Sequence, residues 1–443
     1  MTELFDDQQT APTIPAGAPD PLAVFRHDVL PDWALVHHRL DATEIDHVDA
    51  AVEAAIATVA DRLPAAGRAC VAVGSRGIDR MGEVATATVA ALQRRGLDVF
   101  VVPAMGSHGG ATAAGQLEVL ATLGITEATV GCEIRSSMDT VRLGEVEGGV
   151  PVYLDRHAAT EADVIIPVNR VKPHTDFSGP IESGLLKMIA IGLGKQRGAD
   201  TFHGEGFAVF HTLIPAVAAF TLAHAPIPFG IALVENGLAR LRRIEAVPAD
   251  RIAEREAALL IEADGELARL PVSELDVLIL DRIGKDISGL GMDSNVVGRY
   301  YTGPTGRGLT VQRIIIRDLT DETEGNAVGI GMADVILRRV ADRMDAAKTY
   351  MNCITAKTPE GARIALMVDD DRQALDIGIA CCLKVRAETA RIIRMLDTKH
   401  LEWFYASTPL IDELVATGRC EVVGGPAPIG FDEHGAFLDS LPG

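Results

Sequence analysis

The chain has 443 residues, with 41 basic and 62 acidic side chains and a formal net charge of −21. This length is enough for a large core and predicts two to three domains. With 48% hydrophobic and only 4% aromatic residues, the composition favours an aliphatic α/β protein. The negative charge argues against nucleic acid or an anionic membrane as a partner.

Strands and helices are expected to alternate along the first part of the chain. Residues 1–22 are polar and proline-rich without periodicity, and we expect them to form a mobile tail. Strands are expected over 69–74, 99–102, 164–168 and 229–234, and helices over 82–95, 113–123, 207–223 and 249–267. Short β-branched runs between helices are typical of βαβ units and a largely parallel sheet.

A second α/β unit is expected after the segment RLPVSELD, which is a candidate hinge. Its strands are expected over 277–281, 314–317 and 364–368, and its helices over 333–346 and 372–395. We therefore predict an α/β fold of two α/β domains, residues 23–270 and 271–443, with largely parallel sheets and an active-site cleft between the domains.

Three polar loops follow strands of the first unit. GSRGIDR begins at Gly74, PAMGSHGGAT contains His108, and NRVKPHTDF contains His174. Ligands of parallel sheets bind beyond the carboxyl ends of the strands. The three loops are therefore expected to converge on one site.

The run from Asn169 to His203 has the composition of an anion-binding and proton-transfer site. It contains His174, a glycine-rich loop and five cationic side chains: Arg170, Lys172, Lys187, Lys195 and Arg197. Lys187 lies in the apolar segment GLLKMIAIGLG, where a charge must be neutralised, paired or used covalently. A helix lysine that extends its ammonium into water is the alternative.

These motifs resemble the signature of the lactate racemase family, whose members hold a nickel-pincer nucleotide through a covalently attached lysine and a histidine ligand. The resemblance spans roughly residues 74–295. It implies that Lys187 attaches the cofactor, that His203 ligates nickel, and that His108 and His174 are the catalytic acids and bases. A tridentate pincer leaves one position of a square-planar Ni(II) for an imidazole.

The resemblance further implies a racemase or epimerase, an isomerase that inverts the C2 carbinol of a 2-hydroxy acid. One histidine would remove the hydroxyl proton while hydride moves to the cofactor, and return to the opposite face would give the other stereoisomer. Histidine suits this work because its unperturbed pKa is about 6.5. Further contacts to the cofactor or substrate are expected from Ser75, Arg76 or else Arg80, Gly109, Gly110, Lys172 and Lys195.

The chain departs from the family pattern at three places. GSRGIDR replaces the usual Asp-x-x-Arg-Pro segment, and residues 180–182 resemble an insertion after His174. The family's substrate-binding glutamine and lysine are replaced within GMDSNVVGR. A homologue with a different 2-hydroxy acid substrate is therefore expected.

The sequence leaves two alternative functions open and argues against two more. A non-catalytic carrier of the nickel-pincer cofactor would keep Lys187 and His203 and lose substrate binding. A metal-dependent hydrolase would use His108, His174 and His203 without any lysine adduct. The segment GLGKQRG fits neither a dinucleotide fingerprint nor a phosphate-binding loop, which disfavours a dehydrogenase or an NTPase.

Cysteine usage and the chain's start favour a cytoplasmic protein. The six cysteines have no CxxC or zinc spacing and are expected to be reduced. The N-terminus lacks a signal peptide's apolar segment, and the apolar stretch 208–234 is broken by histidines and prolines. The expected partners are a 2-hydroxy acid and, transiently, the proteins that make the cofactor, with no membrane and no nucleic acid.

Overall fold

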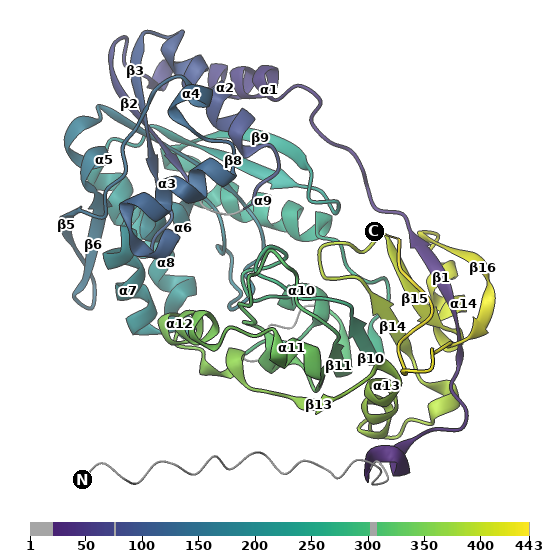
Figure 1. The fold of residues 1–443 in the computed structure, drawn as a ribbon. Coiled ribbons are helices and arrows are strands. Elements are labelled where there is room, and N and C mark those ends of the chain that lie inside the picture. The colour runs from purple at the N-terminus through teal and green to yellow at the C-terminus, as the bar shows by residue number, and fades with distance from the viewer. Residues whose placement is uncertain (1–20, 75–76, 302–307, 443) are drawn as a thin grey trace, which may run out of the picture.

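The computed structural model describes residues 21–74, 77–301 and 308–442. These residues form two lobes, each built around its own sheet (Figure 1). We call the lobe around the six-stranded sheet the first lobe and the lobe around the eight-stranded sheet the second lobe. The α/β class with largely parallel sheets is confirmed.

The first lobe has the strand order β4-β3-β2-β7-β8-β9. Its strands are β2 (Gly67–Val73), β3 (Leu97–Pro103), β4 (Glu133–Ile134), β7 (Val164–Arg170), β8 (Phe229–Glu235) and β9 (Leu241–Pro248). All neighbours are parallel except β8 and β9, which are antiparallel. A separate hairpin joins β5 (Thr140–Val146) to β6 (Val150–Asp155).

Helices cover both faces of this sheet. They are α1 (Val48–Ala57), α2 (Met81–Gln93), α3 (Ala113–Thr122), α4 (Glu127–Val130), α5 (Arg156–Glu161), α6 (Leu185–Lys187), α7 (Lys195–Glu205), α8 (Phe210–His224) and α9 (Ile252–Glu266). Val71 and Val73 face one core, and Cys70 and Ala72 face the other. This alternation is the two-residue period of a strand buried on both sides.

The second lobe has the strand order β13-β12-β11-β10-β14-β15-β1-β16. Its strands are β1 (Asp32–His38), β10 (Glu274–Leu280), β11 (Thr310–Ile316), β12 (Val335–Leu337), β13 (Leu366–Val368), β14 (Ile392–Met395), β15 (Trp403–Ser407) and β16 (Cys420–Pro428). Its helices are α10 (Ser294–Val297), α11 (Arg338–Asp342), α12 (Ala346–Ala356), α13 (Asp371–Ala380) and α14 (Thr408–Ala416). The strands from β13 to β14 are parallel, and the remaining pairs are antiparallel.

The structure corrects three expectations. Strand β1 pairs with β15 and β16, so the domain expected over 23–270 does not contain its own first strand. The helix expected over 333–346 is the strand β12 followed by the short helix α11. The helix expected over 372–395 ends at Ala380, and its last residues form β14, where the β-branched Ile392 and Ile393 are buried between neighbouring strands.

Among the described residues, one helical stretch is long and apolar enough to cross a membrane by length and composition alone, Phe207–His224. Phe210, Ile214 and Val217 of this stretch belong to a core of the first lobe. The stretch contacts the hairpin strands β5 and β6 through the same helix. It thus serves in this structure as a packing helix of the first lobe.

Candidate active site

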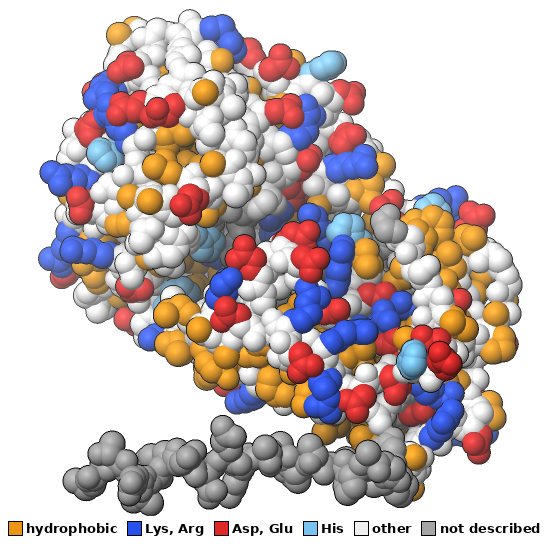
Figure 2. Space-filling view, viewed as in Figure 1, with side chains coloured by type: hydrophobic (Ala, Val, Ile, Leu, Met, Phe, Trp, Pro, Cys, Tyr) orange, Lys and Arg blue, Asp and Glu red, His pale blue; other side chains and the backbone are white. Residues whose placement is uncertain are grey.

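The candidate site lies at the carboxyl ends of β2, β3 and β7. β2 is parallel to both β3 and β7, so the loops that follow these strands emerge at one edge, as expected. From β2 the chain proceeds outward to β3 and β4, whereas from β7 it proceeds outward to β8 and β9. The boundary between β2 and β7 is therefore a topological switch point, where ligands of open α/β sheets bind. Figure 2 shows the surface hollowed between the two lobes, with histidine side chains at the hollow.

The loop of His108 is held by close backbone packing. A Cβ atom on Gly109 would lie 2.4 Å from the carbonyl carbon of Gly115, and Gly109 has a φ of +66°. Thr112 caps α3 by accepting a hydrogen bond from the Gly115 amide at 3.0 Å. Gln116 donates to the carbonyl of His108 at 3.4 Å. The side chain of His108 is exposed on this fixed loop.

Gly109 and Gly110 differ in what a side chain would meet. Gly110 also has a positive φ of +62°, but no atom lies within 4 Å of the Cβ position. The Gly110 backbone is therefore open to an approaching group, whereas Gly109 is required by the packing of the loop. Both positions belong to the left-handed region that favours glycine.

His174 is buried, with 8% of its surface exposed. Its amide donates to a carboxylate oxygen of Glu182 at 2.7 Å, and Glu182 also accepts from the Gly179 amide at 2.9 Å. The Asp176 amide donates to Nδ1 of His174 at 3.0 Å, so the neutral ring carries its proton on Nε2. The residues that resemble an insertion thus bring in Glu182, which holds the main chain of His174.

Lys187 and His203 are close enough to act on each other electrostatically. Lys187 is the last residue of α6, and a π-helix, η4 (Met188–Gly192), follows directly. Such π-helical turns occur frequently at functional sites. Burial lowers the pKa of His203, and the charge of Lys187 lowers it further. Its Nδ1 atom is buried and has no hydrogen-bond partner.

Aromatic side chains connect His203 to His174. The ring centroid of Phe207 lies 5.8 Å from that of His203 and 6.3 Å from that of His174. The ring centroid of Phe177 lies 4.3 Å from that of His174 with the rings tilted, and that of Phe210 lies 6.0 Å from that of His203. The two imidazoles therefore share one apolar wall, which excludes water from their inner sides.

The loop of His108 packs against the helix that follows Lys187. The Gly106 amide donates to the carbonyl of Gly192 at 3.2 Å. A Cβ atom on Gly192 would lie 2.5 Å from the carbonyl oxygen of Ala104. The structure thereby brings the elements that carry His108, His174, Lys187 and His203 to one region of the first lobe.

Lys195 has a different role from the one expected. Its side chain is fully buried, with its ammonium 3.0 Å from Asp155 and 3.2 Å from the side-chain oxygen of Gln116. It also donates to the carbonyl of Pro103. An ammonium surrounded in this way cannot reach a cofactor phosphate, so the expected anion contact of Lys195 is wrong. Lys195 instead ties α7 to the strand end and the helix that flank His108.

The other expected cationic contacts divide into three cases. Lys172 forms an ion pair of 2.9 Å with Asp293 of the second lobe, which already neutralises its charge. Arg80 binds Glu83 and the carbonyl of Ile45 and lines a separate groove along α1 and α2. Ser75 and Arg76 lie outside the described residues.

The alternative of a metal-dependent hydrolase needs several protein ligands around one ion. Within residues 21–74, 77–301 and 308–442, no three His, Cys, Asp or Glu side chains are grouped in a way that could hold a metal ion. His108, His174 and His203 therefore do not form a three-histidine ligand set in this arrangement.

Glu256 is a functional candidate that the sequence analysis missed. It lies on α9 and is 1% exposed, and its carboxylate accepts from the Leu186 amide at 2.9 Å, one residue before Lys187. A Cβ atom on Gly184 would lie 2.3 Å from this carboxyl group, so glycine is required there. The sequence did carry a signal, because Glu256 lies on the same helix face as the buried Ile252, Leu259 and Leu260.

We expect Glu256 to make the stability of the protein depend on pH. Burial raises the pKa of Glu256 to about 7, although hydrogen bonds from backbone amides lower it. The folded state keeps a proton that the unfolded chain releases near its ordinary pKa of about 4.3, so the unfolding free energy falls as pH rises between these values. The total loss is about 4 kcal/mol and is complete above pH 7.

Chemical denaturation of Glu256→Gln at pH 5 and pH 8 tests this expectation. The variant should lack most of the fall in unfolding free energy that the parent shows between the two values. Glu262→Gln on the same helix is the matched control, because Glu262 is partly exposed and paired with Arg243. Equal pH dependence in the parent and in Glu256→Gln would contradict the assignment.

Asp293 and Asn295 of the second lobe also reach this region. Asp293 pairs with Lys172, and Asn295 donates to the carbonyl of His174 at 3.2 Å. Both lie in GMDSNVVGR, the segment in which the motif resemblance implied altered substrate contacts. Sequence reasoning pointed to this segment but did not name these two side chains.

Comparisons with known proteins give structural likeness only. No protein-family model matches the chain, and no curated protein sequence matches it. The structure is similar to a structural-genomics crystal structure of a protein from Thermotoga maritima, with 15% identity, a TM-score of 0.48, and coverage of 61% of this chain and 70% of that chain. It is also similar to the lactate racemase apoprotein from Thermoanaerobacterium thermosaccharolyticum, with 13% identity, a TM-score of 0.42, and coverage of 84% and 89%. At these values the similarity assigns no activity to this chain.

Proposed function

We propose that this chain is an isomerase that inverts the C2 carbinol of a 2-hydroxy acid with the help of a nickel-pincer nucleotide. Lys187 would attach the nucleotide, His203 would ligate the nickel, and His108 and His174 would be the acid and base. The proposal rests on the motif resemblance and on the geometry of these residues. The protein would act in the cytoplasm, with cofactor-biosynthesis proteins as transient partners.

The main support for the proposal is the unpartnered Nδ1 atom and the lowered pKa of His203, which lies near Lys187. Its buried Nδ1 atom lacks a hydrogen-bond partner, and its lowered pKa keeps the imidazole neutral at physiological pH. A neutral imidazole with a free ring nitrogen is the form that binds a transition metal. The donor set thus fits one protein ligand to a metal whose other ligands come from a cofactor attached at Lys187.

When bound, the nucleotide would supply an acceptor for the hydrogen that leaves C2 with its electron pair. The chain's own residues would handle the proton of the hydroxyl group. With Nδ1 accepting from the Asp176 amide, His174 presents an N–H group at Nε2 and can donate there. To accept a proton at Nε2 the ring needs its other tautomer, in which Nδ1 gives up the hydrogen bond from the Asp176 amide. The Asp176 carboxylate, 3.7 Å from Nδ1, would have to move closer to accept from the new N–H group.

His108 would serve the opposite face of the substrate. Its loop is fixed by Gly109 and Gln116 while its side chain is exposed, so the ring can reach a ligand that His174 approaches from within the protein. Two bases are needed because the two stereoisomers present the hydroxyl group in opposite directions. Gly110, with open space at its Cβ position, allows a close approach of the ligand to the backbone.

The competing proposal is a non-catalytic carrier of the same cofactor, and the test separates the two. Protein from a host that makes the nucleotide is incubated with single enantiomers of 2-hydroxy acids that carry deuterium at C2. We expect the opposite enantiomer to form with its deuterium retained, because the label moves as hydride. A carrier would convert none of the acids, and loss of deuterium to solvent would indicate ordinary proton abstraction from C2.

A further inference from the structure

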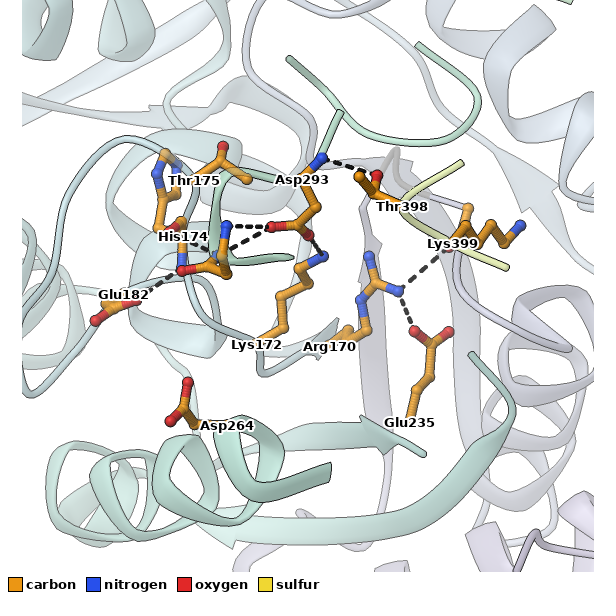
Figure 3. Close-up of polar contacts among 12 residues, drawn as sticks. Arg170, Lys172, His174, Thr175, Glu182, Glu235, Asp264, Asp293, Thr398 and Lys399 are labelled. Carbon is orange, nitrogen blue, oxygen red and sulfur yellow. Dashed lines mark hydrogen bonds and ion pairs between the residues drawn. The ribbon is translucent and has the colours of Figure 1, made fainter. Parts of the chain in front are cut away.

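The second lobe reaches the loop of His174 through two contacts, which we call the clasp. Asp293 accepts a hydrogen bond from the Lys172 ammonium at 2.9 Å (Figure 3). Asn295 donates to the carbonyl of His174 at 3.2 Å. The side chain of Asn295 also donates to Asp293 at 3.1 Å. The two contacts are therefore joined to each other within the second lobe.

The second-lobe side of the clasp is buried, whereas the side chain of Lys172 is partly exposed. Asp293 is 5% exposed and Asn295 is fully buried. Burial alone would raise the pKa of Asp293, but the Lys172 ammonium and the donors of Asn295 offset it, so the pKa lies below its usual range. Removing Lys172 would leave the buried Asp293 carboxylate without its counter-charge, which is far more costly than losing a surface ion pair.

The clasp joins loops that follow the carboxyl ends of strands in both sheets. Lys172 follows β7, and Asp293 lies in the loop after β10. The Asp293 amide is in turn held by the loop after β14, because it donates to the Thr398 hydroxyl at 2.9 Å. β10 and β14 are parallel neighbours from which the chain proceeds in opposite directions, so this is the switch point of the second sheet.

The main chain of His174 is thus held from both lobes. Glu182 of the first lobe accepts from its amide, and Asn295 of the second lobe donates to its carbonyl. A contact that served only to join the lobes would not need to meet the backbone of this residue. We propose that Asp293 and Asn295 are positioning residues, through which the second lobe sets the placement of the His174 ring.

The expected effect on kcat rests on the proposed function, whereas the expected effect on the mobility of the His174 main chain does not. A misplacement of about 1 Å at a reacting group can cost about 100-fold in rate. Loss of the clasp should therefore lower kcat while leaving the KM for substrate and the cofactor at Lys187 unchanged. It should also expose the His174 amide to solvent more often.

The test uses the full-length holoprotein with Asp293→Asn and Asn295→Ser. Asp371→Asn is the matched control, since Asp371 is a buried carboxylate of the same lobe that pairs with Arg317 and does not belong to the clasp. We measure hydrogen exchange of the peptide covering 172–178, the mass of the Lys187 peptide, and kcat and KM for the converted 2-hydroxy acid. Both clasp variants should exchange faster in this peptide and lose about 10- to 100-fold in kcat, while the control matches the parent.

Hydrogen exchange and kinetics are measured separately, so that a failure of the positioning role can be distinguished from a failure of the proposed function. Unchanged hydrogen exchange over 172–178 in both variants overturns the clasp, whatever the activity. Faster exchange with normal kcat would mean that the contacts have a structural role only, and it would contradict the proposal that Asp293 and Asn295 position the His174 ring. If the parent converts no 2-hydroxy acid, the proposed function fails, and the kcat part of the inference fails with it. If Asp293→Asn does not fold, Asn295→Ser carries the same readings, because it removes the donor to the His174 carbonyl and to Asp293 while leaving the Asp293 carboxylate paired with Lys172.

Discussion

Lys187→Ala is expected to remove the covalent adduct and with it all measurable turnover. If Lys187 carries the nucleotide, the holoprotein has an added mass confined to the peptide that contains Lys187. Alanine has no amine to form the bond, so the mass should disappear together with the conversion of 2-hydroxy acids. Intact-mass measurement and peptide mapping of protein from a host that makes the nucleotide provide the check.

Two further variants show whether the loss is specific to the amine and to this position. Lys187→Arg keeps the positive charge beside His203 but should form no adduct. His203→Ala should keep the adduct and lose nickel occupancy, because the imidazole contributes a ligand and little to the core. An adduct on another peptide, or undiminished turnover of Lys187→Ala, would refute the assignment.

His108→Ala and His174→Ala are each expected to lower turnover by about 10²- to 10⁴-fold, the usual cost of losing a general acid or base. Every cycle uses both residues, one on each face of the substrate, so either change should stop inversion in both directions. The adduct at Lys187 should remain, since neither histidine is assigned to hold the cofactor. Turnover of each enantiomer and the mass of the Lys187 peptide are measured together.

His224→Ala is a suitable control for these two variants. His224 is an exposed residue at the end of α8 whose ring contacts the carbonyl of Phe220. It should behave as the parent protein does. Near-normal turnover of either His108→Ala or His174→Ala would contradict the two-base scheme. Loss of the adduct at Lys187 would show that the altered histidine has a structural role.

The sequence was enough to locate the edge of the sheet that carries the candidate site. β2, β3 and β7 are short apolar runs, each followed by a polar loop, and parallel pairing then brings the loops together. The positions of His108 and His174 after β3 and β7 follow from this pattern alone. Local sequence determines which strand a loop follows, so this part of the site was predictable.

The partners of the cationic residues could not be predicted, because they come from distant parts of the chain. Lys195 pairs with Asp155 and donates to Pro103, and Lys172 pairs with Asp293. Composition indicated an anion site, and it could not reveal that these two charges, and that of Arg170 beside Glu235, are already balanced inside the protein. The same limit applies to β1, whose pairing with β15 and β16 joins residues more than 360 positions apart.

The position of β1 in the second sheet also determines how the lobes can move. The chain passes from the second lobe to the first after β1 and returns before β10, so two covalent crossings join the lobes. At the first crossing the Arg39 amide is bonded to Arg419 of the second lobe, while the carbonyl of Thr43 is bonded to Asn236 of the first. At the second, Arg269 is tied to Asp264 of α9, and β10 begins at Glu274. We therefore expect any opening between the two lobes to be a rotation about the line through these two short connections, because sliding of one lobe along the other is resisted at both.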